Sequence, residues 1–372
     1  MPGPPFSSLV DGLAAAVPFV PPEALERRTG KALRLRLGAN ESLFGPSPRA
    51  LEAMQAALGR VACYGDPEST ELRAAVASVH GVTAENVVVT SGIDDLLGLA
   101  VRAFVDPGVV AVTSLGAYPT FNFHVFGFGG LIERVPYRND ANDLQALSDL
   151  ARRTNARVVY LANPDNPTGT WHSAVAVTKL VDSLPPRSVL LLDEAYIEYA
   201  PPGTAPAVDG DDPRVIRMRT FSKAHGMAGA RIGYGIASPA TVGAFDKIRH
   251  HFGVNRIAQA GALASLGDTE YVARLASLVA EGRSHYEAIG RKLGVATLPS
   301  ATNFVTFDVG SKPMARAIVA ALQDRGVFVR TPGAPPIDRC IRVTVGPASE
   351  RAEFADVFGE IWAARGSLRL AP

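Results

Sequence analysis

The stretch Thr220–Tyr234, TFSKAHGMAGARIGY, decides the interpretation of this chain. Lys223 follows two hydroxyl residues, Thr220 and Ser222, and Arg231 comes shortly after it. Small residues fill most of the interval, which favours a backbone pressed closely against something rather than an ordinary surface loop. Hydroxyls and a guanidinium that converge on one point are suited to hold an anion such as a phosphate.

The lysine in this stretch has the surroundings of a reactive amine. Small residues shield Lys223, and Arg231 is a nearby cation, so we expect a lowered pKa and a nucleophilic amine. The pattern suggests a Schiff base between Lys223 and pyridoxal phosphate, with Thr220, Ser222 and Arg231 on the phosphate. The alternative is a solvated lysine in a turn rich in glycine and alanine, and the motif alone does not decide between the two.

Length, composition and charge exclude several classes of protein. The 372 residues predict two domains, and the 47% hydrophobic and 20% charged fractions are typical of a globular protein. A net charge of +1 points to neither nucleic acid nor an anionic membrane as a partner. The chain has only two cysteines, Cys63 and Cys340, which cannot make a disulfide framework, so we expect a reducing compartment. Neither the cysteines nor the histidines have metal-ligand spacing, so we assign no metal. With no signal peptide and no apolar run long enough to cross a membrane, we expect a cytoplasmic enzyme.

Short strands alternate with helices from Val87 onward. We expect strands at 87–90, 109–114, 157–164, 188–196, 214–223 and 231–237, with a helix at 174–184. This alternation predicts an α/β domain with a mainly parallel sheet flanked by helices. Ligands bind at the carboxyl ends of the strands in such sheets, so we expect the polar motifs that follow the strands to meet there.

The two ends of the chain have a different texture. Prolines break the first 38 residues into an arm, and helices are expected at 49–58 and from Ser69 or Thr70 to Gly81. After Val254 we expect helices at 257–266, 271–293, 313–325 and 349–364, and strands at 302–309, 327–331 and 340–346. The predicted division is an arm and part of the small domain in 1–38, a large cofactor-binding domain in 39–254, and a small α+β domain in 255–372.

Two motifs that follow strands are suited to the cofactor's phosphate and ring oxygen. Ser91-Gly92-Ile93-Asp94 ends a strand and opens a helix, whose free N–H groups and dipole make a phosphate seat. The alternative is an ordinary strand–helix turn. In NPDNPTG (163–169), Asn166 is placed to donate a hydrogen bond to a phenolate oxygen, unless the segment is only a proline–glycine turn.

Two further motifs are suited to the ring itself. LLLDEAY ends a strand with Asp193, and a buried carboxylate is costly unless it is paired. A protonated pyridine nitrogen would be that partner, and Tyr196 would reach the ring oxygen. GAYPTF (116–121) places Tyr118 and Phe121 where an aromatic side chain stacks on a flat ring, with core packing as the alternative for both.

The order of these motifs, with a late RVTVG (342–346), resembles the fold-type-I pyridoxal-phosphate aminotransferases, and among them the histidinol-phosphate aminotransferase group. GANESLFGPSP (38–48) and YGDPESTELR (64–73) are similar to segments of that group. The resemblance implies a large domain with a mainly parallel sheet and a smaller α+β domain. It also implies transfer of an amino group between an amino acid or amino-alcohol phosphate and a 2-oxo acid in a ping-pong cycle.

The resemblance also implies a role for each residue around the cofactor. Lys223 would hold the cofactor covalently and move the proton between the substrate and the cofactor, while Asp193 pairs with the pyridine nitrogen. Tyr196 and Asn166 would bind the ring hydroxyl, and Tyr118 would stack on the ring, with Phe121 as the substitute. The phosphate would be bound by Thr220, Ser222, Arg231 and the backbone of Gly92, Ile93 and Asp94. Ile93 stands where the group usually has serine, which leaves only the backbone contact at that position.

The remaining implied roles concern the substrate and a second subunit. Tyr64 would reach the phosphate of the neighbouring subunit, which implies a homodimer with shared active sites. Arg342 would clamp a carboxylate or phosphate of the substrate through its planar fork, and Arg330 is a second candidate unless it is a solvated loop arginine. Asn40 and Phe19 are further candidates for the substrate pocket, with Phe19 in place of the group's usual tyrosine.

Three other functions compete with aminotransfer. A decarboxylase or lyase of the same fold, such as one acting on a phosphorylated threonine, shares these motifs. A nicotinamide-dependent oxidoreductase is disfavoured because the glycine-rich segment GFGG (127–130) lacks the GxGxxG spacing. A catalytically inactive ligand-binding module is disfavoured by the complete set of residues around Lys223.

Overall fold

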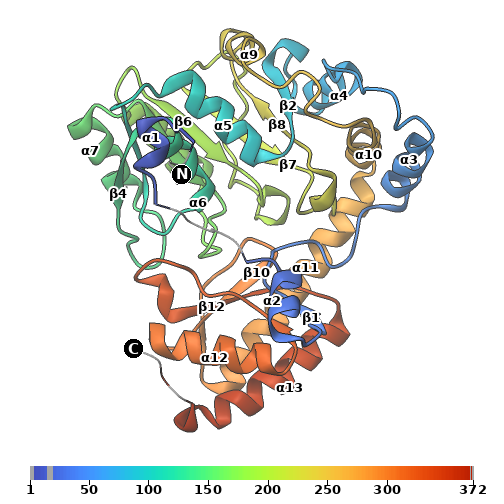
Figure 1. Cartoon of the computed structure of the whole chain (residues 1–372), viewed down its shortest axis with the longest axis vertical. Helices are drawn as coiled ribbons and strands as arrows, with labels where there is room; N and C mark the ends of the chain where they lie inside the picture. The colour runs from blue at the N-terminus through green and yellow to red at the C-terminus, as the bar shows by residue number, and fades with distance from the viewer. Residues whose placement is uncertain (1–3, 15–19, 369, 371–372) are drawn as a thin grey trace.

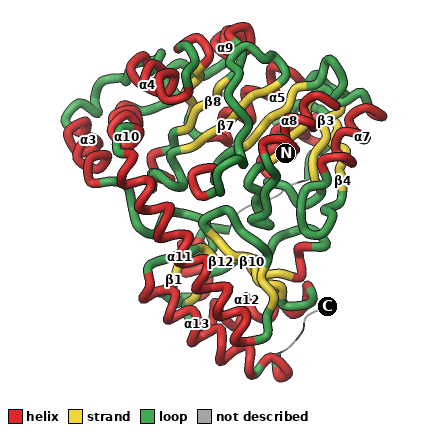
Figure 2. The backbone as a smooth tube through the Cα atoms, turned by 180° about the vertical axis from the view of Figure 1, so that it is seen from behind, coloured by secondary structure: helices red, strands yellow, loops and turns green. Residues whose placement is uncertain are grey.

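The computed structural model of the chain describes residues 4–14, 20–368 and 370, so the predicted pocket residue Phe19 lies outside the described residues. A seven-stranded sheet and its helices occupy one end of the molecule, and smaller sheets with helices occupy the other (Figure 1). The helix α11 (Thr269–Leu293) runs from the first group into the second (Figures 1 and 2). No helix in the described part of the chain is long and apolar enough to span a membrane.

The large sheet has the strand order β2-β8-β7-β6-β5-β3-β4. Neighbouring strands run parallel except β8, which is antiparallel to both β2 and β7. The strands are β2 (Val87–Thr90), β3 (Val110–Ser114), β4 (Leu131–Val135), β5 (Val158–Ala162), β6 (Val189–Asp193), β7 (Val215–Thr220) and β8 (Gly233–Ile236). The predicted mainly parallel α/β sheet is therefore confirmed.

Both faces of this sheet are covered by helices, which explains its continuous apolar strands. In β5, Val158 and Tyr160 pack with one group of helices, and Val159 and Leu161, which point the other way, pack with another. The first group is α5 (Ile93–Phe104), α6 (Pro119–Gly127) and α9 (Pro239–Asp246). The second is α7 (Leu144–Thr154) and α8 (Ala174–Ser183). A third cluster joins α3 (Pro48–Leu58), α4 (Thr70–His80) and α10 (Arg256–Leu266) to β2 and β8.

The smaller end contains two short sheets. One is antiparallel with the order β12-β10-β9, and in the other β1 pairs in parallel with β11. The strands are β1 (Leu35–Arg36), β9 (Ala296–Thr297), β10 (Phe304–Asp308), β11 (Val327–Phe328) and β12 (Cys340–Thr344). They share a core with α11, α12 (Lys312–Asp324) and α13 (Ala348–Ala363). The remaining helices are α1 (Ser8–Asp11) and α2 (Pro22–Thr29).

Several elements were not predicted from the sequence, among them β4, α6 and α7. The strand β4 has the sequence LIERV and pairs only with β3, at the edge of the sheet, so it lacks the apolar run of a buried strand. The helix α6 begins at Pro119 within the motif expected to supply a stacking aromatic, and α7 begins after Asp143, whose side chain accepts a hydrogen bond from the N–H of Ala146.

The predicted start of α4 at Ser69 or Thr70 is confirmed, because Thr70 is the first helical residue. The hydroxyl cap that this capping signal implies is not formed. Ser69 has a positive φ of 49° and its side chain makes no capping hydrogen bond. The carboxylate of Asp66 accepts from the N–H groups of Thr70, at 2.7 Å, and Glu68, at 2.9 Å. A carboxylate complements the helix dipole as well as the free donors, so it serves where the sequence pattern suggested a hydroxyl.

Candidate active site

The carboxyl ends of the central strands open into a cavity of about 740 Å³. Loops that follow β3, β5, β6 and β7 line one side of it, and residues beside β11 and β12 line the other. Most of the predicted site residues line this cavity: Asn40, Ile93, Asp94, Tyr118, Asn166, Asp193, Tyr196, Thr220, Ser222, Lys223, Arg231, Arg330 and Arg342. The tertiary structure thus brings together residues from motifs spread over three hundred positions of sequence.

Lys223 lies in the loop after β7 with its amine directed into the cavity. Its Nζ donates a 3.0 Å hydrogen bond to the backbone oxygen of Asn40 and lies 5.6 Å from the centre of the Tyr196 ring. Burial, and then repulsion by the Arg342 guanidinium, lower the pKa of Lys223 to about 8. A substantial fraction of the amine is therefore neutral near physiological pH, as a nucleophilic lysine requires.

Asp193 ends β6 with a buried carboxylate. Its Oδ2 accepts from the hydroxyl of Tyr160 at 2.7 Å, and its Oδ1 accepts from the N–H of Ala195 at 3.0 Å. Burial raises the pKa of Asp193 to about 6, and no cationic side chain of the described residues forms an ion pair with it. Sequence reasoning missed Tyr160, although a phenol in the otherwise apolar strand VVYLA was a usable signal.

Asn40 connects three parts of the site. Its Nδ2 donates to the hydroxyl of Tyr196 at 3.0 Å, and its backbone oxygen accepts from Lys223 and from Nδ2 of Asn303. Its N–H donates to Oγ1 of Thr344 at 3.1 Å. Burial raises the pKa of Tyr196 to about 12, so the phenol keeps its proton at neutral pH.

The segment predicted to bind the cofactor's phosphate lies at the start of α5. Gly92 has a φ of 90°, and a Cβ at this position would lie 2.7 Å from Nη2 of Arg231. The backbone conformation therefore favours glycine there, and the guanidinium of Arg231 lies close to its Cα. Ile93 and Asp94 are the first two helical residues, and Arg231 lies 3.7 Å from the Asp94 carboxylate. The N-terminal N–H groups and the guanidinium together form an anion site.

Two hydroxyls complete this seat. Thr220 Oγ1 donates to Ser222 Oγ at 2.9 Å, and the N–H of Ser222 donates to Thr220 Oγ1 at 3.0 Å.

Part of the small-residue pattern in this stretch has another cause. Gly226 has a φ of 69°, and a Cβ there would lie 2.2 Å from the carbonyl oxygen of Gly45. That glycine is needed for packing against the chain's own turn.

The two aromatic candidates are separated by the structure. Tyr118 precedes α6 and lines the cavity, where burial raises its pKa above the ordinary value. Phe121 is fully buried and stacks on Tyr160 with ring centres 5.0 Å apart and planes 14° apart. Phe121 therefore belongs to the core under the site, and Tyr118 is the one with access to a bound ring.

The two arginine candidates are neighbours across an antiparallel bridge, in which Arg342 N donates to Arg330 O at 2.7 Å. Arg342 donates from Nη1 to Oδ1 of Asn166 and from Nη2 to the carbonyl oxygen of Gly38. Burial lowers the pKa of Arg342 to about 10, and its buried Nε has no hydrogen-bond partner among the described residues. Arg330 donates to the carbonyl oxygen of Val20 at 3.1 Å, so it is anchored rather than a solvated loop residue.

Tyr64 lies away from the cavity of its own chain. Its side chain is 77% exposed, and its ring lies against that of Phe252, with centres 4.6 Å apart. Within the described residues no group of His, Cys, Asp or Glu could hold a metal ion.

The residues present fit pyridoxal phosphate. The buried Asp193 carboxylate lacks a cationic partner, which a protonated pyridine nitrogen would supply. The anion seat at Gly92 and Arg231 matches a phosphate, and the depressed pKa of Lys223 matches an amine that attacks an aldehyde. These three features lie around one cavity of suitable size for a cofactor and a small substrate.

Comparison with known proteins agrees with this chemistry. The family model "Aminotransferase class I and II" matches residues 34–358. Histidinol-phosphate aminotransferase 2 of Nitrosospira multiformis is 39% identical over 327 residues, covering 86% of this chain and 82% of that protein. Aspartate aminotransferase of Thermus thermophilus with maleate, at a TM-score of 0.78 and 22% identity, covering 97% of this chain and all of that one, shares the fold.

One solved structure is especially similar. The crystal structure of histidinol-phosphate aminotransferase from Sinorhizobium meliloti in complex with pyridoxal-5′-phosphate has a TM-score of 0.93 and 46% identity, covering 96% of this chain and 98% of that one. These findings do not favour the decarboxylase alternative. The chain belongs to the class I and II aminotransferases, and it is a pyridoxal-phosphate-dependent aminotransferase.

Proposed function

We propose that the amino donor carries a phosphate or carboxylate at its far end, as histidinol phosphate does, and that the acceptor is a 2-oxo acid. The observation that carries this proposal is the pair of guanidiniums, Arg330 and Arg342, on bridged backbone at the cavity that holds Lys223. Two partly buried cations beside one another are stabilised when an anion enters between them. The names of the similar proteins agree with an amino-alcohol phosphate as the donor.

The cofactor, when bound, withdraws electrons from the substrate's Cα and so acidifies the proton there. Lys223 holds the cofactor before the donor enters, and its amine then carries the proton away from Cα. Asp193 keeps the pyridine nitrogen protonated, with Tyr160 and the Ala195 N–H fixing the carboxylate. Tyr196 and Asn166, which line the cavity, are assigned to the ring hydroxyl, and Tyr118, which also lines it, is assigned to the face of the ring.

The phosphate of the cofactor is assigned to the seat made by Gly92, Ile93, Asp94 and Arg231. The hydroxyls of Thr220 and Ser222, which are bonded to one another, turn toward the anion when it binds. The substrate's anion is assigned to Arg342 and Arg330, and its reacting end to the neighbourhood of Asn40. Separate cationic sites for the two anions keep the cofactor and the substrate from competing.

We further propose a homodimer in which Tyr64 reaches the cofactor's phosphate in the neighbouring subunit. A row of exposed apolar side chains supports this assembly: Leu51, Leu58, Val61, Tyr64 and Phe252 are 47%, 53%, 67%, 77% and 55% exposed. Leu51 and Leu58 lie one heptad apart on the same face of α3, and the rings of Tyr64 and Phe252 lie against one another. An apolar row of this kind is a typical feature of a protein–protein interface.

The domain limits 1–38, 39–254 and 255–372, and a cytoplasmic location, also remain proposals. Pairing of β1 with β11 supports the assignment of the first segment's end to the small domain. The absence of a disulfide, with Cys63 exposed and Cys340 buried and free, agrees with a reducing compartment.

The proposed substrate is tested by a donor screen. The enzyme, loaded with cofactor, is given histidinol phosphate and 2-oxoglutarate, and the glutamate formed is measured. L-Histidinol without the phosphate is the matched control, and we expect a much lower kcat/KM for it. A higher kcat/KM for a donor without a distal anion would contradict the proposal, and carbon dioxide from phosphothreonine would support the decarboxylase instead.

A further inference from the structure

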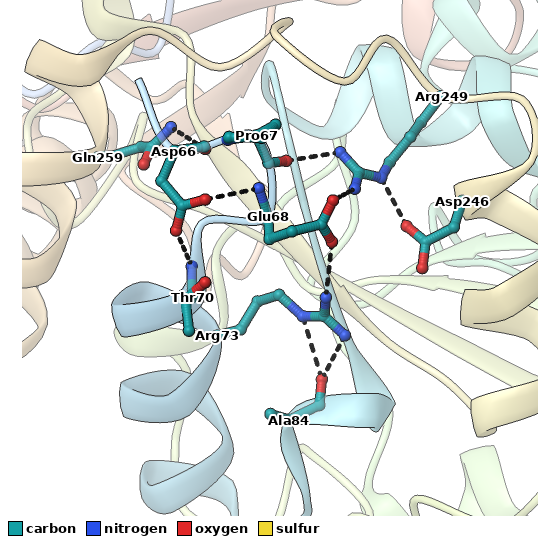
Figure 3. Close-up of polar contacts among 9 residues, drawn as sticks. All are labelled: Asp66, Pro67, Glu68, Thr70, Arg73, Ala84, Asp246, Arg249 and Gln259. Carbon is teal, nitrogen blue, oxygen red and sulfur yellow. Dashed lines mark hydrogen bonds and ion pairs between the residues drawn. The ribbon is translucent and has the colours of Figure 1, made fainter. Parts of the chain in front are cut away.

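The segment that carries Tyr64 is fastened to its own chain through its backbone carbonyls. The oxygen of Tyr64 accepts from Nη2 of Arg256. The oxygen of Asp66 accepts from Nε2 of Gln259 at 3.0 Å, and that of Pro67 accepts from Nη1 of Arg249 at 2.7 Å (Figure 3). All three donors come from residues 249–259, so one stretch of chain holds the whole segment.

Arg249 is the centre of this attachment (Figure 3). Besides the Pro67 oxygen, it binds Glu68 Oε1 from Nη2 at 2.7 Å and Asp246 Oδ1 from Nε at 2.5 Å. Its side chain is only 9% exposed. A planar guanidinium that uses all three nitrogens in this way fixes the position of its partners along more than one direction.

A second set of bonds fixes the far end of the segment. Glu68 also forms an ion pair with Arg73 at 3.4 Å, and Arg73 donates twice to the carbonyl oxygen of Ala84 (Figure 3). The Asp66 carboxylate caps α4 through Thr70. The backbone around Tyr64 is therefore rigid although its side chain is not buried.

The stretch 249–259, which holds the Tyr64 segment, also contacts residues next to the proposed phosphate seat of its own subunit. Ser91 Oγ donates to the carbonyl oxygen of Gly253 at 2.6 Å, and Asn255 Nδ2 donates to that of Ala230 at 3.2 Å. Gly65 is closely packed against this stretch, because a Cβ there would lie 3.0 Å from Nε2 of Gln259. The segment and the exposed Tyr64–Phe252 pair thus form one surface outside the cavity of their own chain.

We propose that Arg249 is a positioning residue that acts in trans: it sets the Tyr64 segment so that the Tyr64 hydroxyl meets the cofactor's phosphate in the partner subunit. This inference rests on the proposed homodimer. Because the segment is held in place before the dimer forms, less conformational entropy is lost when Tyr64 binds the phosphate.

The test uses hybrid dimers in which one chain carries Lys223→Ala, so that a single site can bind the cofactor covalently. In that site, Lys223 comes from the intact chain and Tyr64 from the Lys223→Ala chain. Arg249→Ala is placed in one chain or in the other, with different affinity tags for purification. The dissociation constant of pyridoxal phosphate at the Lys223 site is measured by absorbance titration, alongside turnover.

We expect Arg249→Ala on the Lys223→Ala chain to raise this dissociation constant about tenfold or more, the loss of roughly one charge-assisted hydrogen bond. The same substitution on the intact chain should leave it within about twofold. The matched control is Arg102→Ala, which removes a bond from an arginine to the Ile248 carbonyl oxygen but touches no residue of the Tyr64 segment. It should have no effect in either chain.

An effect that follows the chain with Lys223, or an equal effect in both, would overturn the trans role of Arg249. If Arg249→Ala dimers do not assemble, Arg249→Lys, which keeps a cation without the fork, is tested in the same two arrangements and must show the same asymmetry. A wild-type protein that is monomeric by light scattering would refute the dimer itself and with it this inference. Transamination by the wild type would still stand as a separate result.

Discussion

The amine of Lys223 donates a 3.0 Å hydrogen bond to the backbone oxygen of Asn40, a residue 183 positions earlier in the chain. Asn40 has a φ of 55°, a conformation that asparagine and glycine adopt more readily than other residues. From there its side chain reaches the hydroxyl of Tyr196. Asn40 also contacts Thr344 in β12, so it fixes Lys223, Tyr196 and the β12-β10-β9 sheet relative to one another.

Replacing Asn40 tests this arrangement. Asn40→Ala loses the bond to Tyr196 and adds backbone strain, so we expect it to lower the free energy of unfolding by about 2–4 kcal/mol. Asn40→Gly loses the same bond without the strain and should cost about 1 kcal/mol less than alanine. Chemical denaturation of the cofactor-free protein measures both. Equal destabilisation by the two variants would show that the conformation of Asn40 carries no strain.

Lys223→Ala removes the covalent link to the cofactor. We expect turnover to fall below detection while pyridoxal phosphate still binds without a covalent bond, because Arg231 and Asp193 remain. Borohydride reduction followed by mass spectrometry should attach the cofactor's mass to Lys223 in the wild type and to no residue of the site in the variant. Transamination by the variant at the wild-type rate would contradict the assignment of Lys223 as the lysine that binds the cofactor.

The amine of Lys223 should titrate well below an ordinary lysine. Burial, and then the charge of Arg342, lower its pKa to about 8, so it loses its proton as the pH rises through that value. The rate of Lys223 labelling by an amine-directed reagent in the cofactor-free protein should have its midpoint there. Arg342→Gln removes a positive neighbour and should move the midpoint upward. A midpoint near 10.5 in the wild type would contradict the burial of this amine.

The ionised, buried carboxylate of Asp193 should lower the free energy of unfolding of the cofactor-free protein. Burial raises its pKa from 3.8 to about 6, so the folded state binds more protons than the unfolded state between these values and loses stability as the pH rises through them. Asp193→Asn should therefore stabilise the cofactor-free protein by about 2–3 kcal/mol at pH 8, and much less at pH 4. The same variant should bind pyridoxal phosphate more weakly, since an amide does not pair with a pyridinium. Thermal unfolding with and without cofactor measures both, and a destabilised cofactor-free variant at pH 8 would refute this account.

Arg342 should govern the substrate rather than the cofactor. Removing one partner of a partly dry ion pair costs about 2–5 kcal/mol, so Arg342→Ala should lower kcat/KM for anionic donors about 30- to several-thousand-fold. Arg342→Lys should recover only part of this, because an ammonium lacks the planar fork. The dissociation constant of pyridoxal phosphate should change far less, since Arg231 lies at the phosphate seat. Equal kcat/KM values for wild type and Arg342→Ala on every donor would show that Arg342 does not bind the substrate's anion. Arg330 would then be the next candidate.

The strands of the large sheet could be predicted from sequence because they are buried on both faces. Val87–Thr90 is a largely apolar strand followed by the Ser91–Asp94 motif, and Val189–Asp193 is an apolar run that ends in Asp193. The edge strand β4, with Glu133 and Arg134 in it, carried no such signal. The cap of α4 was misassigned because several residues before a helix can accept the same hydrogen bonds, and only the backbone path decides which one does.

The sequence by itself indicated the cofactor, because the motifs taken together resemble those of the pyridoxal-phosphate aminotransferases. Each of these motifs follows a strand, and parallel strands end at one edge of a sheet, where their side chains meet. Lys223, Asp193 and Asn166 could be named on that ground. Only the tertiary structure decided what depends on packing between distant segments. It placed Tyr118 in the cavity and Phe121 in the core, joined Tyr160 to Asp193, and anchored Arg330 beside Arg342. Burial and neighbouring charge, which set the pKa of Lys223, arise from contacts that no local pattern encodes.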